Sequence, residues 1–157
     1  MMCLAKGFTL IELMIVVAIV SFLAAVSIPL YQGFVINTQV NRVISEAARL
    51  RTSVENCLLE SRFVIGLAAG QCDPAASGSN LLFGDSQVGA ILAPGTGVPQ
   101  LASPLTQTAT ITASFGNNAT PTLINSNAQV VWSRSEEGYW ICATTGVPAN
   151  FVSRACP

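Results

Sequence analysis

The chain has 157 residues, room for one domain rather than two, and 51% of them are hydrophobic while only 10% are charged. A net charge of −1 leaves no basic surplus to neutralise a phosphate backbone, so direct binding of nucleic acid is not expected. The chain has no histidine, which removes the commonest general base and most zinc sites, so composition disfavours an enzyme and predicts no metal or cofactor.

The N-terminal segment contains a long apolar run, Phe8 to Ile28, in which Glu12 is the one charged residue. A helix of this length rises about 31 Å, which is enough to cross a hydrocarbon core of about 30 Å. Lys6 lies on the short side of the run, and this position predicts that the N-terminus stays in the cytoplasm while the remainder is exported.

A secretory signal peptide is the alternative explanation of this run, because the small residues Ala24, Val26 and Ser27 could form a cleavage site. However, the run is longer than the usual apolar region of about 7–15 residues, and it contains a carboxylate near its cytoplasmic end. Both features favour a membrane-spanning helix.

Glu12 is unusual because a carboxylate within a spanning helix costs about 2.5–3.5 kcal/mol on insertion scales. Its position one helical turn into the run lowers this cost, and the side chain could simply extend to the lipid headgroups. The segment itself offers no cation, so the functional alternative is a partner from a second molecule.

The sequence KGFTLIELMIVVA at residues 6–18 resembles the processing and membrane segment of type IV pilins, with its glycine, phenylalanine and glutamate correctly spaced. This resemblance implies that residues 1–7 are a leader peptide, which a prepilin peptidase removes between Gly7 and Phe8, and that the new amine of Phe8 is N-methylated. It also implies that Glu12 pairs with the N-terminal amine of a neighbouring subunit during assembly. Such a pairing would neutralise two charges that are costly in lipid and fix the axial register of two apolar helices.

The same resemblance implies a structural protein that polymerises with copies of itself into a type IV pilus, which serves attachment, twitching motility and, in some members, DNA uptake. Its other partners would be the prepilin peptidase and N-methyltransferase and the inner-membrane pilus assembly machinery. The precursor would lie in the inner membrane with a cytoplasmic N-terminus, and the assembled pilus would be extracellular. No residue pattern identifies a host surface receptor.

Residues 29–62 continue the helix beyond the transmembrane segment, residues 8–28. Pro29 removes one backbone hydrogen bond and Gly33 adds local weakness, so we expect a bend at this point. Apolar residues then recur at three- and four-residue steps, as Ile36, Val40, Val43, Ile44, Ala47, Leu50, Val54, Cys57 and Leu58. This pattern predicts one helix from Phe8 to Arg62 with an amphipathic second half.

Two pairs on the amphipathic half, Arg42 with Glu46 and Arg51 with Glu55, have the i,i+4 spacing of helical ion pairs. Arg51 also falls within the apolar arc of the helix. It should therefore either extend outward or find an acidic partner.

Residues 63–157 differ from the helical part in composition, since small residues dominate and there is no charge between Ser86 and Ser133. Residues 66–104 should form a long connection with short ordered pieces. Alternation and β-branching predict strands at 88–92, 108–115, 122–124, 129–134 and 139–143, with turns at 116–118 and 135–138. We therefore expect an α+β fold with a small antiparallel sheet packed on the amphipathic helix, and the resemblance implies the ladle shape of pilins.

Five cysteines are present, and Cys3 belongs to the predicted leader. The other four allow three pairings, of which we favour Cys57–Cys72 and Cys142–Cys156 because each closes a short loop. The segment between Cys142 and Cys156 resembles the disulfide-bounded C-terminal loop of type IVa pilins, the group that includes the Pseudomonas pilins. In that group the loop can contribute to adhesion and subunit packing, although a purely structural disulfide is the alternative here.

Three functions follow from these observations. The first is a major type IVa pilin, the second a pseudopilin or minor pilin with the same start, and the third a membrane-anchored monomeric adhesin. The C-terminal disulfide loop and the lack of an acidic calcium cluster favour the first over a major pseudopilin. A monomeric adhesin would be indifferent to Glu12, whereas a polymer would not.

Overall fold

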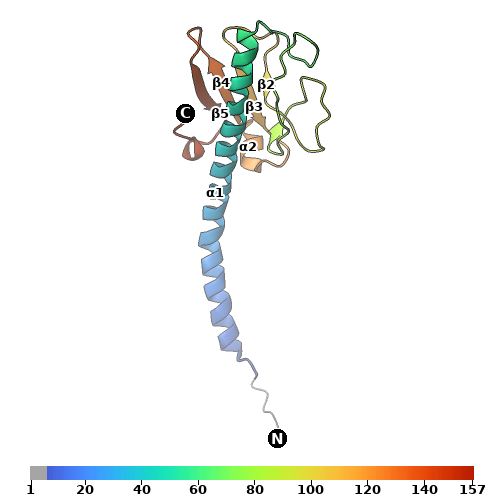
Figure 1. Ribbon diagram of the computed structural model, residues 1–157. Helices are drawn as coiled ribbons and strands as arrows, with labels where there is room; N and C mark the ends of the chain where they lie inside the picture. Colours follow the sequence, from blue (N-terminus) through green and yellow to red (C-terminus); the bar gives the residue numbers. More distant parts are fainter. Residues whose placement is uncertain (1–6) are drawn as a thin grey trace. The chain divides into compact units, whose positions relative to one another are not determined.

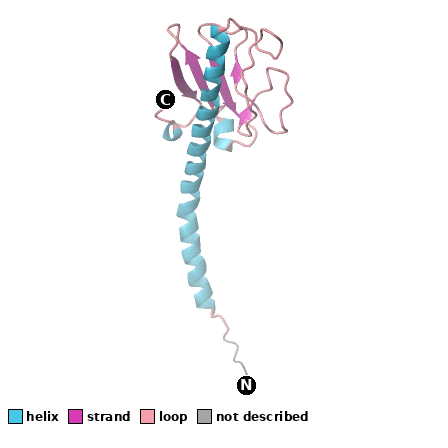
Figure 2. Ribbon diagram, in the orientation of Figure 1, coloured by secondary structure: helices cyan, strands magenta, loops and turns pink. Residues whose placement is uncertain are grey.

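The computed structural model describes residues 7–157 (Figures 1 and 2). Residues 1–6, which carry Cys3, Lys6 and most of the predicted leader, lie outside the described residues. The elements are α1 (Leu10–Leu59), β1 (Leu82–Phe83), β2 (Gln100–Leu101), β3 (Thr110–Phe115), α2 (Pro121–Asn125), β4 (Gln129–Arg134), β5 (Trp140–Thr145) and a 3₁₀ helix (Ala149–Phe151). The chain divides into two compact units, one ending at Phe34 and one comprising Val35–Pro157, and each is described by itself.

The N-terminal unit consists of the first half of α1 and the few described residues that precede it. Every residue from Gly7 to Gln32 is exposed, so this apolar segment has no core of its own. By length and composition alone, α1 is able to cross a membrane. Two of its serine hydroxyls are satisfied within the helix, since Ser21 Oγ donates to the carbonyl of Val17 and Ser27 Oγ to that of Leu23.

Pro29 and Gly33 both lie inside α1, which continues through them without interruption. Pro29 has no amide hydrogen to donate to the carbonyl of Ala25 one turn earlier, so one backbone bond is missing there. The single helix predicted across this point is confirmed, while the bend stays a prediction.

The far end of α1 comes at Leu59, three residues before the predicted Arg62. Ser61 has a positive φ of 57°, and the amide of Arg62 returns to the carbonyl of Cys57 at 2.8 Å. A left-handed residue that allows the following amide to bond back in this way is a typical helix stop.

The C-terminal unit contains a five-stranded antiparallel sheet. Its main order is β1-β3-β4-β5, and the short β2 pairs with β3 on the same edge as β1. The second half of α1 runs across one face of this sheet (Figure 2). The α+β fold expected from the sequence is therefore confirmed.

The core lies between α1 and this sheet. All nine apolar positions predicted for the amphipathic helix are buried, from Ile36 to Leu58. On β3 the side chains alternate, with Ile111, Ala113 and Phe115 buried and the intervening polar residues partly exposed. Full burial of an aliphatic side chain contributes about 1.5–3 kcal/mol, so this layer supplies most of the stability of the unit.

The long connection between α1 and β3 is confirmed, but the strand predicted at 88–92 is wrong. Gly89 has a φ of +73°, which breaks an extended run, and Ile91 is fully exposed. The ordered pieces are instead β1, β2 and two isolated bridges, one between Ile65 and Cys72 and one between Ser79 and Gly97.

The strand predicted at 122–124 is also wrong, because these residues belong to α2. Pro121 occupies the first turn of this short helix, where its fixed φ and missing amide hydrogen carry no penalty. Leu123 then points into the core and is fully buried. The β-branched residues around it favoured a strand, and Pro121 was the signal that should have outweighed them.

The hairpin predicted near the C-terminus is confirmed. β4 has the predicted bounds, and β5 begins at Trp140, one residue later than predicted, and extends to Thr145. The turn is closed by the amide of Ser135, which donates to the carbonyl of Tyr139 at 2.7 Å.

Candidate functional site

Glu12 and Thr9 form a capping box at the start of α1. The amide of Thr9 donates to Glu12 Oε2 at 3.0 Å, and the amide of Glu12 donates to Thr9 Oγ1 at 3.3 Å. The hydroxyl of Thr9 also donates to Glu12 Oε2, at 2.7 Å. The carboxylate is therefore fixed beside the helix N-terminus, while Oε1 makes none of the hydrogen bonds found within residues 7–157.

Gly7 and Phe8 precede this cap and belong to no helix or strand. Both are exposed, and Phe8 is 79% accessible. A Cβ added at Gly7 would meet nothing within 4 Å. The bond predicted to be cleaved thus lies in an exposed stretch just before the helix.

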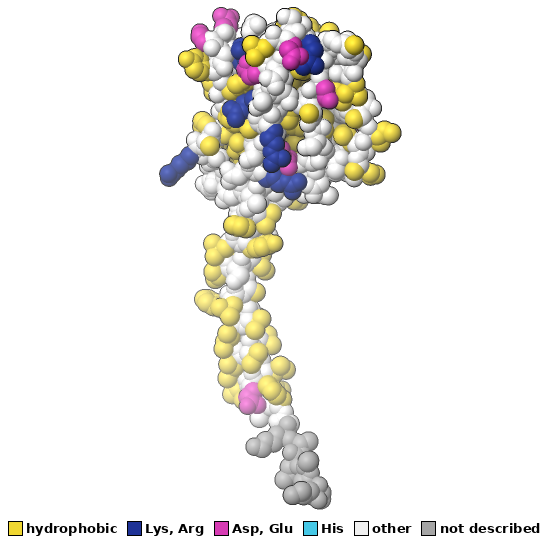
Figure 3. All heavy atoms as spheres, in the orientation of Figure 1, with side chains coloured by type: hydrophobic (Ala, Val, Ile, Leu, Met, Phe, Trp, Pro, Cys, Tyr) yellow, Lys and Arg dark blue, Asp and Glu magenta, His cyan; other side chains and the backbone are white. Residues whose placement is uncertain are grey.

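An apolar surface follows the cap along the N-terminal unit, and Figure 3 shows its yellow side chains. Glu12 is the one charged residue between Phe8 and Phe34. The large exposed side chains include Phe8, Leu10, Ile11, Leu13, Met14, Ile15, Val16, Val17, Ile19, Val20, Phe22, Leu23, Val26, Ile28, Leu30, Tyr31 and Phe34. A surface of this extent needs lipid or other protein to cover it.

Two disulfides join the cysteine pairs favoured from the sequence. Cys57, at the end of α1, is bonded to Cys72, and this bond fastens the loop after the helix. Cys142 on β5 is bonded to Cys156. All four sulfur-bearing side chains are buried, so both bonds are part of the core.

The C-terminal loop between Cys142 and Cys156 is held at several points. The amide of Thr144 donates to the carbonyl of Pro157 at 2.8 Å, which pairs the end of the chain with β5. Val147 and Phe151 pack against the core from within the loop. The loop is thus a fixed part of the surface of the C-terminal unit.

Glu55 connects α1 to the sheet through a charged hydrogen-bond network. Its Oε1 accepts from Arg134 Nε at 2.7 Å and from Trp140 Nε1 at 2.7 Å, and its Oε2 accepts from Arg134 Nη2 at 3.3 Å. Arg134 also donates to the carbonyl of Gln107 at 2.8 Å. The Arg134 guanidinium holds the pKa of Glu55 below its usual range, against the opposing effect of burial. The pairing of Glu55 with Arg51 predicted from helical spacing is therefore wrong.

Arg51 satisfies neither of the alternatives predicted for it. Its guanidinium lies 4.0 Å from the centroid of the Trp132 ring, and Nε donates to the carbonyl of Ala48. The indole of Trp132 in turn donates to the carbonyl of Ile44 at 3.4 Å. A cation over an aromatic face replaces the acidic partner, and the packing of β4 on α1 creates it.

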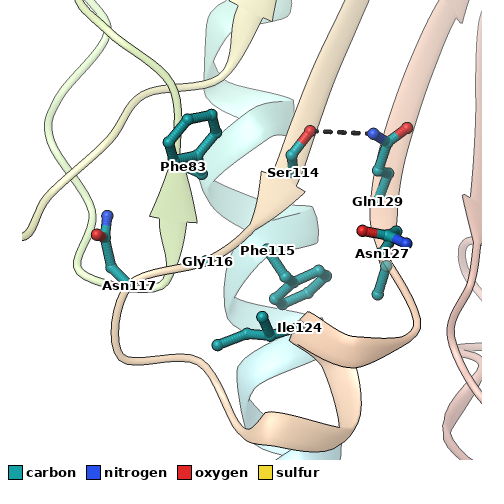
Figure 4. Close-up of a pocket in the computed structure, with 9 residues that line it drawn as sticks. Phe83, Ser114, Phe115, Gly116, Asn117, Ile124, Asn127 and Gln129 are labelled. Atoms are coloured by element: carbon teal, nitrogen blue, oxygen red, sulfur yellow. Dashed lines mark hydrogen bonds between the residues drawn. The ribbon is translucent and has the colours of Figure 1, made fainter.

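A shallow groove of about 510 Å³ opens beside the end of β3 (Figure 4). Its lining is neutral, with Phe83, Phe115 and Ile124 beside amide and hydroxyl groups, and Gln129 donates to Ser114 at 3.2 Å. The lining contains no titratable side chain. Across residues 7–157 no group of three or more Cys, Asp or Glu side chains is arranged to hold a metal.

Comparison with known protein families decides the affiliation of the chain. The family described as pilin (bacterial filament) matches residues 37–157, and the prokaryotic N-terminal methylation motif matches residues 2–28. The chain belongs to the pilin family. The first match covers nearly the whole C-terminal unit, and the second covers the apolar run with its capping box.

Individual relatives of this pilin agree with the family match. It is 47% identical to a probable minor fimbrial protein of Dichelobacter nodosus, over 96% of this chain and 93% of the relative. It is 44% identical to the type IV major fimbrial protein FimA of the same organism, over 99% and 98%. A fimbrial protein of Pseudomonas aeruginosa is 35% identical over 97% and 96%.

Sequence reasoning missed two features of this pilin that the structure reveals. The T-x-x-E pattern of Thr9 and Glu12 is a capping-box signature and could have been found. The contact between Glu55 and Arg134 joins residues 79 positions apart, and no local pattern indicates it.

Proposed function

We propose that this pilin is a structural subunit of a type IV pilus and that it polymerises with copies of itself through its N-terminal helix. One observation carries the proposal: residues 7–32 are all exposed, although nearly all of the large side chains among them are apolar. The methylation-motif match and the relatives named as type IV fimbrial proteins support the same function. The side chains that lack cover in the monomer would form the core of the filament.

Processing of the precursor is part of this proposal. A prepilin peptidase would cut between Gly7 and Phe8 and methylate Phe8, and both residues are exposed and lie outside any helix or strand. Residues 1–7 would be the leader, residues 8–28 the membrane and filament-core helix, residues 29–62 the amphipathic helix, and residues 63–157 the globular domain. Before assembly the N-terminus would lie in the cytoplasm, at the inner-membrane machinery that builds the pilus.

Glu12 would have two roles in this pilin. Its Oε2 caps the helix of its own chain, and its negative charge would attract the methylated amine of a neighbouring subunit. The amine and the carboxylate are each costly in an apolar core, so pairing them would fix one axial register.

The experiment compares Glu12→Gln with Thr9→Val in the full-length protein. Glutamine can serve in a capping box, so Glu12→Gln retains the helix start and removes only the charge. Thr9→Val removes the hydroxyl and retains the charge. We expect sheared filament to be lost with Glu12→Gln and largely preserved with Thr9→Val; normal yield from Glu12→Gln would exclude the charge pairing.

Processing is tested by the intact mass of surface-sheared protein under non-reducing conditions. We expect a chain that begins at Phe8, one methyl group heavier and four hydrogens lighter than the unmodified reduced chain. A chain that retains residues 1–7, or one that begins near Ile28, would contradict the proposed cleavage.

A minor pilin is the second candidate, because relatives at 47% identity are named probable minor fimbrial proteins. The two candidates differ in abundance. Quantitative mass spectrometry of purified filaments should find this chain as the principal component if it is the major subunit. A small fraction of the total, with filaments persisting after deletion of its gene, would indicate the minor role.

A further inference from the structure

Three ion pairs and one ring contact compensate part of the charge of the C-terminal unit. Arg42 pairs with Glu46 and Arg62 with Glu60, each at 2.7 Å, Arg134 pairs with Glu55, and Arg51 lies over Trp132. Of the arginines in this unit, which is fully described, Arg49 and Arg154 alone form neither an ion pair nor a ring contact. Both are exposed.

Arg49 and Arg154 lie on the same half of the unit, and we call them the basic face. Arg49 follows Arg42 by seven residues on α1, so the two point in the same direction. Arg154 is held beside β5 by the disulfide between Cys142 and Cys156. Cys142 is paired in register with Trp132, whose indole reaches the carbonyl of Ile44 on the preceding turn of α1.

Glu136 and Glu137 occupy the turn between β4 and β5, and we call them the acidic turn. Both are exposed and neither takes part in an ion pair within residues 7–157. The turn follows Arg134, which is bonded to Glu55, so it lies near the end of α1 and away from Arg49.

The basic face and the acidic turn are separated along the axis of α1, so the unit has an uneven distribution of charge. Arg49 precedes Glu60, at the end of α1, by about 17 Å of helix. The other unpaired acids are Asp73, beside the same helix end through Cys72, and Asp85, after β1. The chain carries no charge between Ser86 and Ser133, so that long segment contributes nothing to the charge pattern of the surface.

We propose that in the filament the basic face of one copy contacts the acidic turn of the next copy, an inference that rests on the proposed function. The basic face and the acidic turn are opposite in sign, and this complementarity commits the surface to a second copy of the chain. The contact is heterologous, so it repeats head to tail and does not close. Copies stacked in opposite directions would bring like charges together, so the contact favours a parallel arrangement.

The test reverses the charges on full-length protein and measures sheared filament. Arg49→Glu with Arg154→Glu, or Glu136→Arg with Glu137→Arg, should each lower the yield about tenfold at low salt, since attraction becomes repulsion at every subunit contact. Combining all four substitutions restores complementarity and the original net charge, so the yield should recover. Thermal unfolding of each variant in detergent confirms that the C-terminal unit is folded.

Salt supplies a second readout. Raising the ionic strength from about 0.01 M to about 1 M shortens the screening length from about 30 Å to about 3 Å, and should reduce the difference between wild type and the two double variants. Two outcomes would overturn the inference: unchanged yield in both double variants, or failure of the quadruple variant to recover. A wild-type chain that forms no filament in the same assay would instead overturn the proposed function, and the inference with it.

Discussion

Glu55 lies in the last third of α1 and accepts three hydrogen bonds from the sheet, two from Arg134 and one from Trp140. The Arg134 side chain is 12% exposed and that of Glu55 is 31% exposed, so solvent screens this pair less than a surface pair. Removal of either partner leaves the other group without its hydrogen-bond partner at the helix–sheet contact. The resulting loss of stability exceeds the net free energy that the intact pair contributes.

We expect Glu55→Gln to lower the free energy of unfolding by about 1–3 kcal/mol, because Trp140 can still donate to the amide oxygen while the charge partner of Arg134 is lost. Denaturant unfolding of the full chain in detergent, followed by tryptophan fluorescence, measures this directly, since both tryptophans lie at the contact. Glu60→Gln is the matched control: Glu60 is 61% exposed and should change stability by less than about 1 kcal/mol. Equal effects of the two substitutions would contradict the role given to Glu55.

The same carboxylate predicts a pH dependence. Hydrogen bonding from Arg134 lowers the pKa of Glu55 in the folded chain, so the native state binds this proton less readily than the unfolded state does. The stabilisation is therefore present above the unfolded pKa, about 4.3, and is lost as pH falls through the lower folded pKa. The difference in stability between wild type and Glu55→Gln should narrow steadily below about pH 4. A difference that stays constant down to about pH 2 would exclude the charge as its origin.

At the level of elements, periodicity predicted what local pattern can determine. The apolar stripe of α1 from Ile36 to Leu58 and the strand pair β4–β5 follow from spacing and alternation, because a repeat of one residue type along the chain fixes a face. The predictions that proved wrong, the strands at 88–92 and 122–124, lie in stretches where the sequence pattern is weak. Thr122–Ile124 has β-branched residues but forms α2, since Pro121 starts a helical turn and Leu123 gains full burial in it.

The residues of the candidate site also fall into those that a local sequence pattern reveals and those that it does not. Glu12 was identified because a charge within an apolar run is visible in the sequence, and its cap with Thr9 was equally visible. The partners of Arg51 and Glu55 lie on β4 and β5, about 80 residues away along the chain. Such contacts depend on the register of the sheet against α1, which no short segment encodes.

The end of β5 permits a test of how tightly the elements pack. Gly146 has a φ of +70°, and a Cβ there would collide with the carbonyl of Ser126, just after α2. Gly89 has nearly the same φ, +73°, and nothing within 4 Å, so Gly89→Ala measures the backbone term alone. We expect about 1–2 kcal/mol of destabilisation from Gly89→Ala and at least about 1 kcal/mol more from Gly146→Ala, by thermal or denaturant unfolding. Equal losses would show that β5 moves away from α2 without resistance.

At the scale of the whole molecule, the two units differ in where their apolar side chains lie: the C-terminal unit buries them in its own core, and the N-terminal unit exposes them. Every residue of the buried core, from Ile36 to Cys156, belongs to the C-terminal unit, together with both disulfides. The N-terminal unit contributes none of it and exposes an apolar surface along its described length. Folding and assembly therefore depend on different parts of one continuous helix.

This separation predicts that a chain starting at Val35 folds and stays monomeric. It retains the whole core and both disulfides, so it should unfold cooperatively and elute as a monomer in light scattering without detergent. The chain from Phe8 should require detergent or form filaments, because its first 27 residues carry the exposed apolar surface. The matched comparison substitutes Leu13, Val17 and Val20 by serine in the longer chain, which should weaken assembly and leave the unfolding temperature of the C-terminal unit unchanged. Filament formation by the chain from Val35 would mean that the C-terminal unit alone directs polymerisation, and the N-terminal helix would then be only a membrane anchor.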